Sequence, residues 1–152
     1  MARWTTCTMI DGEPERVLDV LTDPDACRRW APVDFEVEGH AARLQAGVQT
    51  RVAGRMAGRE IGFDVRILES DVRRLVLHAT GPVHIEARYD AVPEGPRTRL
   101  CASIAVRNAG GLIGRVLSGA TDALLAAGAL DKAMARIAGE VETAAAPAAL
   151  AA

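Results

Sequence analysis

Two side chains near the middle of the sequence, Tyr89 and His78, are of types that could perform acid–base chemistry on a bound molecule. Tyr89 alternates with apolar residues at a period of two, so its ring is expected on the apolar face of a strand. A phenol buried there needs a hydrogen-bond partner or a ligand for its hydroxyl. His78 has the opposite parity to Leu75 and Leu77. It would act as a general acid or base if its face points inward; the strand alternation favours an exposed histidine instead.

Residues that bind metals are present but poorly arranged. A tight turn at 80–82 would set His78 across from His84, but no third ligand is in register with this pair. We therefore expect no metal and no cofactor. The three cysteines are odd in number and widely spaced, which predicts reduced, intracellular thiols rather than a disulfide or a zinc site: Cys7, Cys27 and Cys101.

The residues expected to bind a ligand are mostly aromatic or small. The aromatic candidates for the interior are Trp30, Phe35, Phe63 and Tyr89, with Trp4 expected elsewhere. Cys101 and three positions of a C-terminal helix complete the expected lining: Ala120, Leu124 and Ala127. Small residues in mid-helix leave room for a ligand, or they let the helix approach a curved sheet closely, and both interpretations stay open. Four strand arginines share the parity of charged neighbours, which predicts surface ion pairs: Arg51, Arg55, Arg66 and Arg88.

The elements that would position these residues follow from hydrophobic periodicity. Residues 3–10 favour a strand, Pro14 begins a short helix, and a second short helix covers roughly residues 24–30. Residues 33–107 alternate with a period of two and carry turn signals, which predicts a meander of hairpins with one apolar face.

A continuous helix is expected over residues 112–143, about 48 Å long at ~1.5 Å per residue, and it would cover the apolar face of the sheet. Its expected inward stripe is Leu112, Val116, Ala120, Leu124, Ala127, Leu130, Met134, Ile137 and Val141. Residues 1–143 are thus predicted to form one α+β domain, and the Ala-rich segment 144–152 is predicted to be a disordered tail.

Composition excludes several classes of protein. The chain has 152 residues and a formal net charge of −2, and no basic run is interleaved with aromatics, so we expect no nucleic-acid partner. No segment approaches the ~20 apolar residues of a membrane span, and no signal-peptide core opens the chain. We expect a cytoplasmic protein that is a monomer or a homodimer.

Specific segments resemble the START-like superfamily, also called SRPBCC. Residues 14–24, PERVLDVLTDP, resemble its "P-E-x-V-W-x-x-L-T-D-P" opening, and Trp30 falls where the superfamily often has a tryptophan. Residues 87–93 followed by 98–100 resemble its "Y-x-x-x-P-x-G-x-x-T" hairpin. The resemblance covers residues 3 to about 143 and is greatest to small stand-alone proteins of actinobacterial type, commonly called polyketide cyclase/dehydrase-like.

This resemblance implies a helix-grip fold, in which a curved antiparallel sheet wraps around a long C-terminal helix. A cavity is enclosed between the sheet and the helix. It implies three functional hypotheses. The first is binding of a small hydrophobic molecule in the cavity by a polyketide cyclase-like enzyme, with His78 and Tyr89 as catalytic residues. The second is a non-catalytic carrier or sensor of a lipid-like ligand, which an interior poor in aromatics suits better. The third is a protein-interaction module of the chaperone-activator type.

Overall fold

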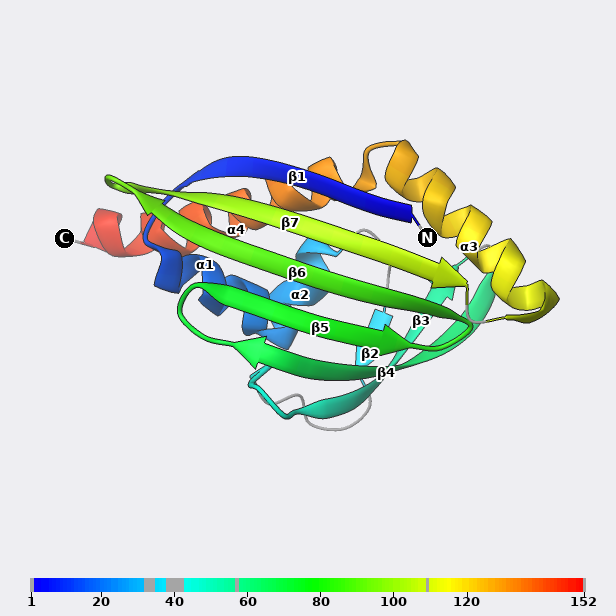
Figure 1. Cartoon of the computed structure of the whole chain (residues 1–152). Helices are drawn as coiled ribbons and strands as arrows, with labels where there is room; N and C mark the ends of the chain where they lie inside the picture. The colour runs from blue at the N-terminus through cyan, green and yellow to red at the C-terminus, as the bar shows by residue number, and fades with distance from the viewer. Residues whose placement is uncertain (1, 32–34, 38–42, 57, 109, 152) are drawn as a thin grey trace.

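The computed structural model describes residues 2–31, 35–37, 43–56, 58–108 and 110–151 as one seven-stranded sheet with four helices (Figure 1). The helices are α1 (Pro14–Thr22), α2 (Pro24–Trp30), α3 (Gly111–Ala126) and α4 (Ala129–Ala151). The strands are β1 (Ala2–Asp11), β2 (Phe35–Val37), β3 (Gln49–Met56), β4 (Arg59–Ser70), β5 (Arg74–Thr80), β6 (Val83–Glu94) and β7 (Arg97–Asn108).

The strands pair antiparallel throughout, in the order β1-β7-β6-β5-β4-β3-β2. From β2 to β7 the chain is therefore a meander, and β1 adds itself to β7 at one edge. The period of two places the apolar residues on one face, which the helices cover, and the charged residues on the other. The α+β helix-grip fold expected from the resemblance is confirmed.

The two short helices begin and end where the sequence predicts. Pro14 occupies the first turn of α1, where its missing N–H costs no hydrogen bond. Asp23 ends α1 and caps α2, because its carboxylate accepts a hydrogen bond from the backbone N–H of Asp25 at 3.0 Å. Val17 and Leu21 are buried in the main core. The pair of helices is thereby fixed against the inner face of the sheet.

The predicted single helix over residues 112–143 is wrong, because the chain breaks it in two. Gly128 has a φ of +90°, a conformation that residues with a side chain rarely adopt. The axes of α3 and α4 differ by 60° across this break. In Figure 1, α4 lies along the back of β1 and β7, whereas α3 turns away toward the end of the sheet. α4 continues to Ala151, beyond the helix end expected at residue 143.

The break also changes which side of α3 faces the protein. In α4 the expected inward residues are buried: Leu130, Met134, Ile137 and Val141. In α3 the buried residues are instead Gly114, Leu117, Thr121 and Leu125. Of the expected stripe on α3, Leu112 and Val116 are exposed and Ala120 and Leu124 are half-buried. The helical periodicity is interrupted at Gly128, so positions that are inward in α4 do not predict which positions are inward in α3.

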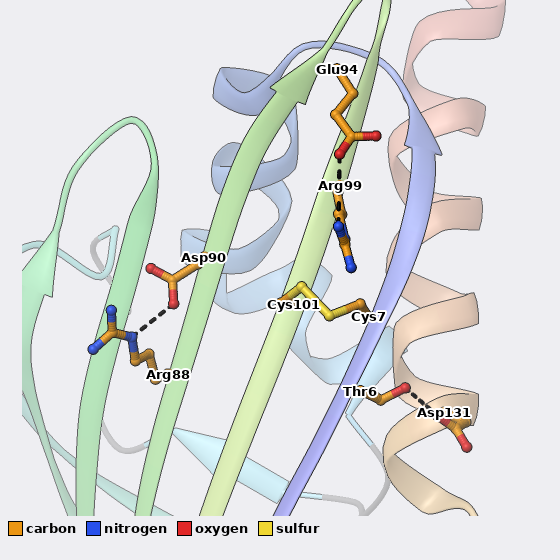
Figure 2. The surroundings of a disulfide bond; sticks show 8 residues. All are labelled: Thr6, Cys7, Arg88, Asp90, Glu94, Arg99, Cys101 and Asp131. Atoms are coloured by element: carbon orange, nitrogen blue, oxygen red, sulfur yellow. Dashed lines mark hydrogen bonds and ion pairs between the residues drawn. A yellow bond between two sulfur atoms is a disulfide. The ribbon is translucent and has the colours of Figure 1, made fainter.

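Cys7 and Cys101 form a disulfide, which corrects the prediction that all three cysteines are free thiols. The two residues are direct cross-strand partners in β1 and β7, with Cα atoms 4.0 Å apart. Figure 2 shows the bond on the sheet, with the neighbouring Thr6 turned to α4, where its hydroxyl donates to Asp131 at 2.6 Å. Since side chains alternate along a strand, Cys7 points to the outer face. With two of its three cysteines oxidised, the protein does not show the reduced thiols from which an intracellular location was expected.

No single helix in the described part of the chain is long and apolar enough to cross a membrane. The bent pair α3 and α4 passes the same criteria of length and composition only when the two are taken together.

Candidate functional site

An apolar cavity lies between the two short helices and the inner face of the sheet. Its volume is about 170 Å³. The helical layer contributes Leu21, Pro24, Cys27 and Trp30, and the sheet contributes Phe35, Thr50, Val52, Val65, Leu75, Leu77 and Tyr89, with Ala31 and Leu44 from the connections. None of these side chains is charged. A larger hollow of about 450 Å³ beside Arg51, Asp64 and Arg66 lies on the charged outer face, so we take the apolar cavity as the candidate site.

Local periodicity explains why these side chains converge. Cys27 and Trp30 are three residues apart on α2 and therefore lie on the same side of that helix. Tyr89 shares the inner face of β6 with Val83 and Ala87, as its parity predicts. The rings of Trp30 and Tyr89 meet edge to face, with centroids 6.0 Å apart and planes inclined by 75°. This contact joins the helical layer to the sheet at the cavity wall.

Two polar side chains of the cavity lining, Trp30 and Tyr89, make no side-chain hydrogen bond to another described residue. Trp30 is 8% exposed, and its indole Nε1–H makes no hydrogen bond within the described residues. Tyr89 is 6% exposed, and none of the hydrogen bonds of the described residues involves its hydroxyl. Burial raises the pKa of Tyr89 well above its usual range, so the phenol stays protonated near neutral pH.

Cys27 is a third polar group in the wall, but its proton already has a partner. Its thiol donates to the carbonyl oxygen of Leu21 at 3.2 Å. Burial raises the pKa of Cys27 to about 12, and the nearby carboxylate of Asp23 adds to this rise. The indole N–H of Trp30 acts in the opposite direction and lowers the pKa of Cys27. The Trp30 nitrogen and the Cys27 sulfur do not meet the geometry of a hydrogen bond. A thiol in this state is neutral and unreactive.

The raised pKa predicts how stability depends on pH. The buried, protonated thiol contributes fully to the free energy of unfolding below pH 9, the pKa of the unfolded chain. This contribution is lost as the pH rises from 9 toward 12, because in that range only the unfolded state releases the proton. At pH 10 the loss relative to pH 7 is expected to be on the order of 1 kcal/mol. Urea unfolding of wild type and Cys27→Ala at both pH values measures it. Tyr89 is common to both proteins, so an equal alkaline loss in the two would contradict the assignment to Cys27.

The structure brings together only part of the residues that the sequence proposes for ligand binding. Trp30, Phe35 and Tyr89 line the cavity. Phe63 is half-buried against a separate small cluster of Ile61, Val83 and Leu117. The remaining candidates do not line the cavity. Cys101 is in the disulfide on the outer face, Ala120 and Leu124 are half-buried on α3, and Ala127 is exposed at the break after it.

His78, the other proposed catalytic residue, lies on the outer face of β5. Its Nε2 is 3.8 Å from a carboxylate oxygen of Glu86, and both side chains are partly exposed. The exposed position favoured by strand alternation is thus observed, and His78 does not reach the cavity. The strand arginines are also on the outer face, where Arg51 pairs with Asp64 and Arg88 with Asp90, as expected for surface ion pairs.

Several residues of the site were not anticipated from the sequence. Cys27, Thr50 and Leu75 line the cavity, and the spacing of Cys27 and Trp30 on one short helix is the signal that could have identified the first. Trp4, expected away from the interior, packs against the main core with its indole nitrogen buried. Among the described residues no cluster of three His, Cys, Asp or Glu side chains is arranged to hold a metal ion.

Comparison with known proteins agrees with this geometry. The family model described as "Polyketide cyclase / dehydrase and lipid transport" matches residues 1–142. The chain belongs to this polyketide cyclase/dehydrase and lipid transport family. The membership inferred from residues 14–24 and 87–100 is thereby confirmed. No curated protein matches the chain.

Solved structures show the same fold at low sequence identity. The Zhui aromatase/cyclase from Streptomyces sp. R1128 is 18% identical, with a TM-score of 0.67 over 93% of each chain. A START superfamily protein from Mycobacterium smegmatis is 18% identical, with a TM-score of 0.64 over 93% of this chain and 97% of that one. The protein NE0264 from Nitrosomonas europaea is 14% identical, with a TM-score of 0.70 over 95% and 96%. Because the family name covers both enzymes and lipid transport, membership of the family does not by itself specify the activity of this chain.

Proposed function

We propose that this member of the family binds a small apolar molecule, or the apolar end of a larger one, in the cavity between α1–α2 and the sheet. The observation that supports this is the lining itself, in which apolar side chains from both layers face a shared space of about 170 Å³. A dry apolar cavity of roughly 150 Å³ is large enough to bind benzene. Pockets for drug-sized ligands occupy roughly 300–1,000 Å³, so a whole polyketide chain exceeds this volume.

Binding without turnover fits the described lining better than cyclase chemistry does. Cyclisation of a polyketone requires a base to remove a proton from carbon. The titratable groups of the described lining, Cys27 and Tyr89, have raised pKa values and remain protonated near neutral pH. They can donate hydrogen bonds but they do not accept a proton. A carrier or sensor of a small hydrophobic ligand is therefore the function we propose, with cyclase-like catalysis as the alternative.

The first experiment is native mass spectrometry of the purified protein, followed by extraction and identification of any bound compound. A co-purifying apolar compound, or a rise in melting temperature with a panel of small hydrocarbons and ketones, supports the proposal. An empty protein whose melting temperature none of these compounds changes contradicts it and favours the protein-interaction module. Conversion of a bound polyketone to a cyclised product would establish the cyclase alternative.

Filling the cavity is expected to weaken ligand binding at least about tenfold, a loss of ~1.4 kcal/mol. Val65 lines the cavity from β4, so the phenyl ring introduced by Val65→Phe would fill part of the cavity volume. Val92 on β6 is 51% exposed, and Val92→Phe makes the same chemical change outside the cavity. Isothermal titration with a ligand from the panel measures both variants. Equal affinities in the two variants would place the ligand outside this cavity.

A further inference from the structure

We propose that the protein forms an antiparallel homodimer, in which the outward side of α3 packs against the same side of α3 in a second copy. The dimer is separate from the cavity and from the proposed function. Only two of the 16 residues of α3 are charged, Arg115 and Asp122. A helix that is apolar all round is normally buried, so the outward side of α3 is expected to have a partner.

The outward side of α3 is an exposed apolar surface at one end of the molecule. Leu112, Ile113 and Val116 are 77%, 54% and 57% exposed. The next turns on this side carry Gly119 and Ala123, which are also exposed. In Figure 1 the first turn of α3 extends past the end of β7, where another molecule can approach it. Exposed apolar patches of this kind mark interaction sites.

The residues on this side differ in size along the helix, and this difference favours one orientation of the partner. Leu112 and Val116 lie in the first two turns. Gly119 and Ala123 lie in the next two, and spacings of three and four place them on the same side. In antiparallel packing about a two-fold axis, Leu112 lies against Ala123 of the second copy, and Val116 lies against Gly119. Large side chains then meet small ones at each contact, whereas parallel packing would set large against large.

The charges favour the same orientation. Arg115 lies in the half of α3 with the large side chains, and Arg59 of β4 lines a hollow of about 130 Å³ beside Leu112. Asp122 lies in the other half of α3. Within the described part of the chain, none of these three charged groups makes an ion pair. Antiparallel packing brings Asp122 of each copy toward the arginines of the other, whereas an anionic lipid surface would be repelled by Asp122.

The dimer is expected to be weak, because a single helix of 16 residues offers a small interface. Specific protein–protein interfaces bury roughly 1,200–2,000 Å² in total, and weak complexes lie at or below the low end of this range. The main core of each copy lies between its own sheet and helices. We therefore expect dilution to dissociate the dimer into folded monomers.

Sedimentation velocity over a series of protein concentrations measures the dissociation constant of the dimer. Gly119→Leu places a large side chain where Val116 of the second copy must fit, and it is expected to raise this constant at least about tenfold. A Cβ added at Gly119 meets no neighbouring element within 4 Å, and leucine is more favourable than glycine inside a helix, so the variant should fold. Gly139→Leu is the matched control on the exposed side of α4, where a Cβ also meets nothing within 4 Å.

Charge reversal tests the orientation of the two copies. Arg115→Glu and Asp122→Lys are each expected to weaken the homodimer. An equimolar mixture of the two variants is expected to form a heterodimer, because the introduced carboxylate then faces the introduced ammonium group. A mixture that associates no more tightly than either variant alone excludes the antiparallel dimer.

Two other results would overturn the proposal. The first is a wild type that is monomeric at every concentration, or that has the same dissociation constant as Gly119→Leu. The second is a monomeric wild type that sediments with phosphatidylglycerol vesicles while Gly119→Leu and Gly139→Leu do so equally, which would assign the apolar surface to lipid. Neither result affects the proposed function, because the cavity lies within one copy.

Discussion

Replacing both Cys7 and Cys101 with serine is expected to lower the free energy of unfolding by about 3–5 kcal/mol. The disulfide joins residues separated by 94 positions in sequence, so it closes a long loop in the unfolded chain. In the chain-entropy model, a cross-link over about 100 residues stabilises the folded state by ~4.7 kcal/mol. The hydrogen-bonded ladder between β1 and β7 remains in the variant, which is therefore expected to fold with the same sheet.

Urea unfolding of wild type and the double variant, each with and without a reducing agent, measures this effect. The reducing agent should bring wild type close to the double variant and should leave the double variant unchanged. Cys27 is a buried free thiol and is present in all four samples, so it serves as an internal control. If reduction and double substitution both leave the stability of wild type unchanged, the disulfide makes no contribution in solution.

Replacing Leu117 with alanine is expected to cost about 2–5 kcal/mol, whereas the same substitution at Leu112 is expected to change stability by less than about 0.5 kcal/mol. Leu117 is 1% exposed and packs with Ile61 and Val83, while Leu112 is 77% exposed. Both variants make the same change in α3. The pair therefore compares burial directly and tests the rotation of α3 that follows from the break at Gly128.

Chemical denaturation of the two variants gives the comparison. The stripe expected from the sequence includes Leu112 and omits Leu117, and it predicts the reverse order of destabilisation. A larger loss for Leu112→Ala than for Leu117→Ala would mean that α3 packs on the sheet through the side that carries Leu112. Equal small losses would mean that neither side of α3 packs stably on β6 and β7.

Part of the cavity wall could be predicted, because strand parity is a strictly local property. The residues of β6 alternate between the two faces, so the inward position of Tyr89 follows once the strand is recognised. Trp30 was expected in the interior as an aromatic residue, and its three-residue spacing from Cys27 on α2 could have identified Cys27 as well. The exposed positions of His78 and the strand arginines follow from the same alternation. Strand parity does not predict which inward residues line the same cavity. Phe63 and Tyr89 both point inward, but Tyr89 lines the cavity and Phe63 packs against a separate cluster.

The order of elements, the α+β class, the family and the inner face of the meander were determined by the sequence alone, because each depends on local periodicity and short motifs. The tertiary structure alone decided three other features. The disulfide depends on β1 pairing with β7 in a register that sets Cys7 beside Cys101. The exposed side of α3 depends on the left-handed conformation of Gly128, which resets the helical phase. The cavity depends on how α1 and α2 sit on the sheet, a packing distance that no local pattern encodes.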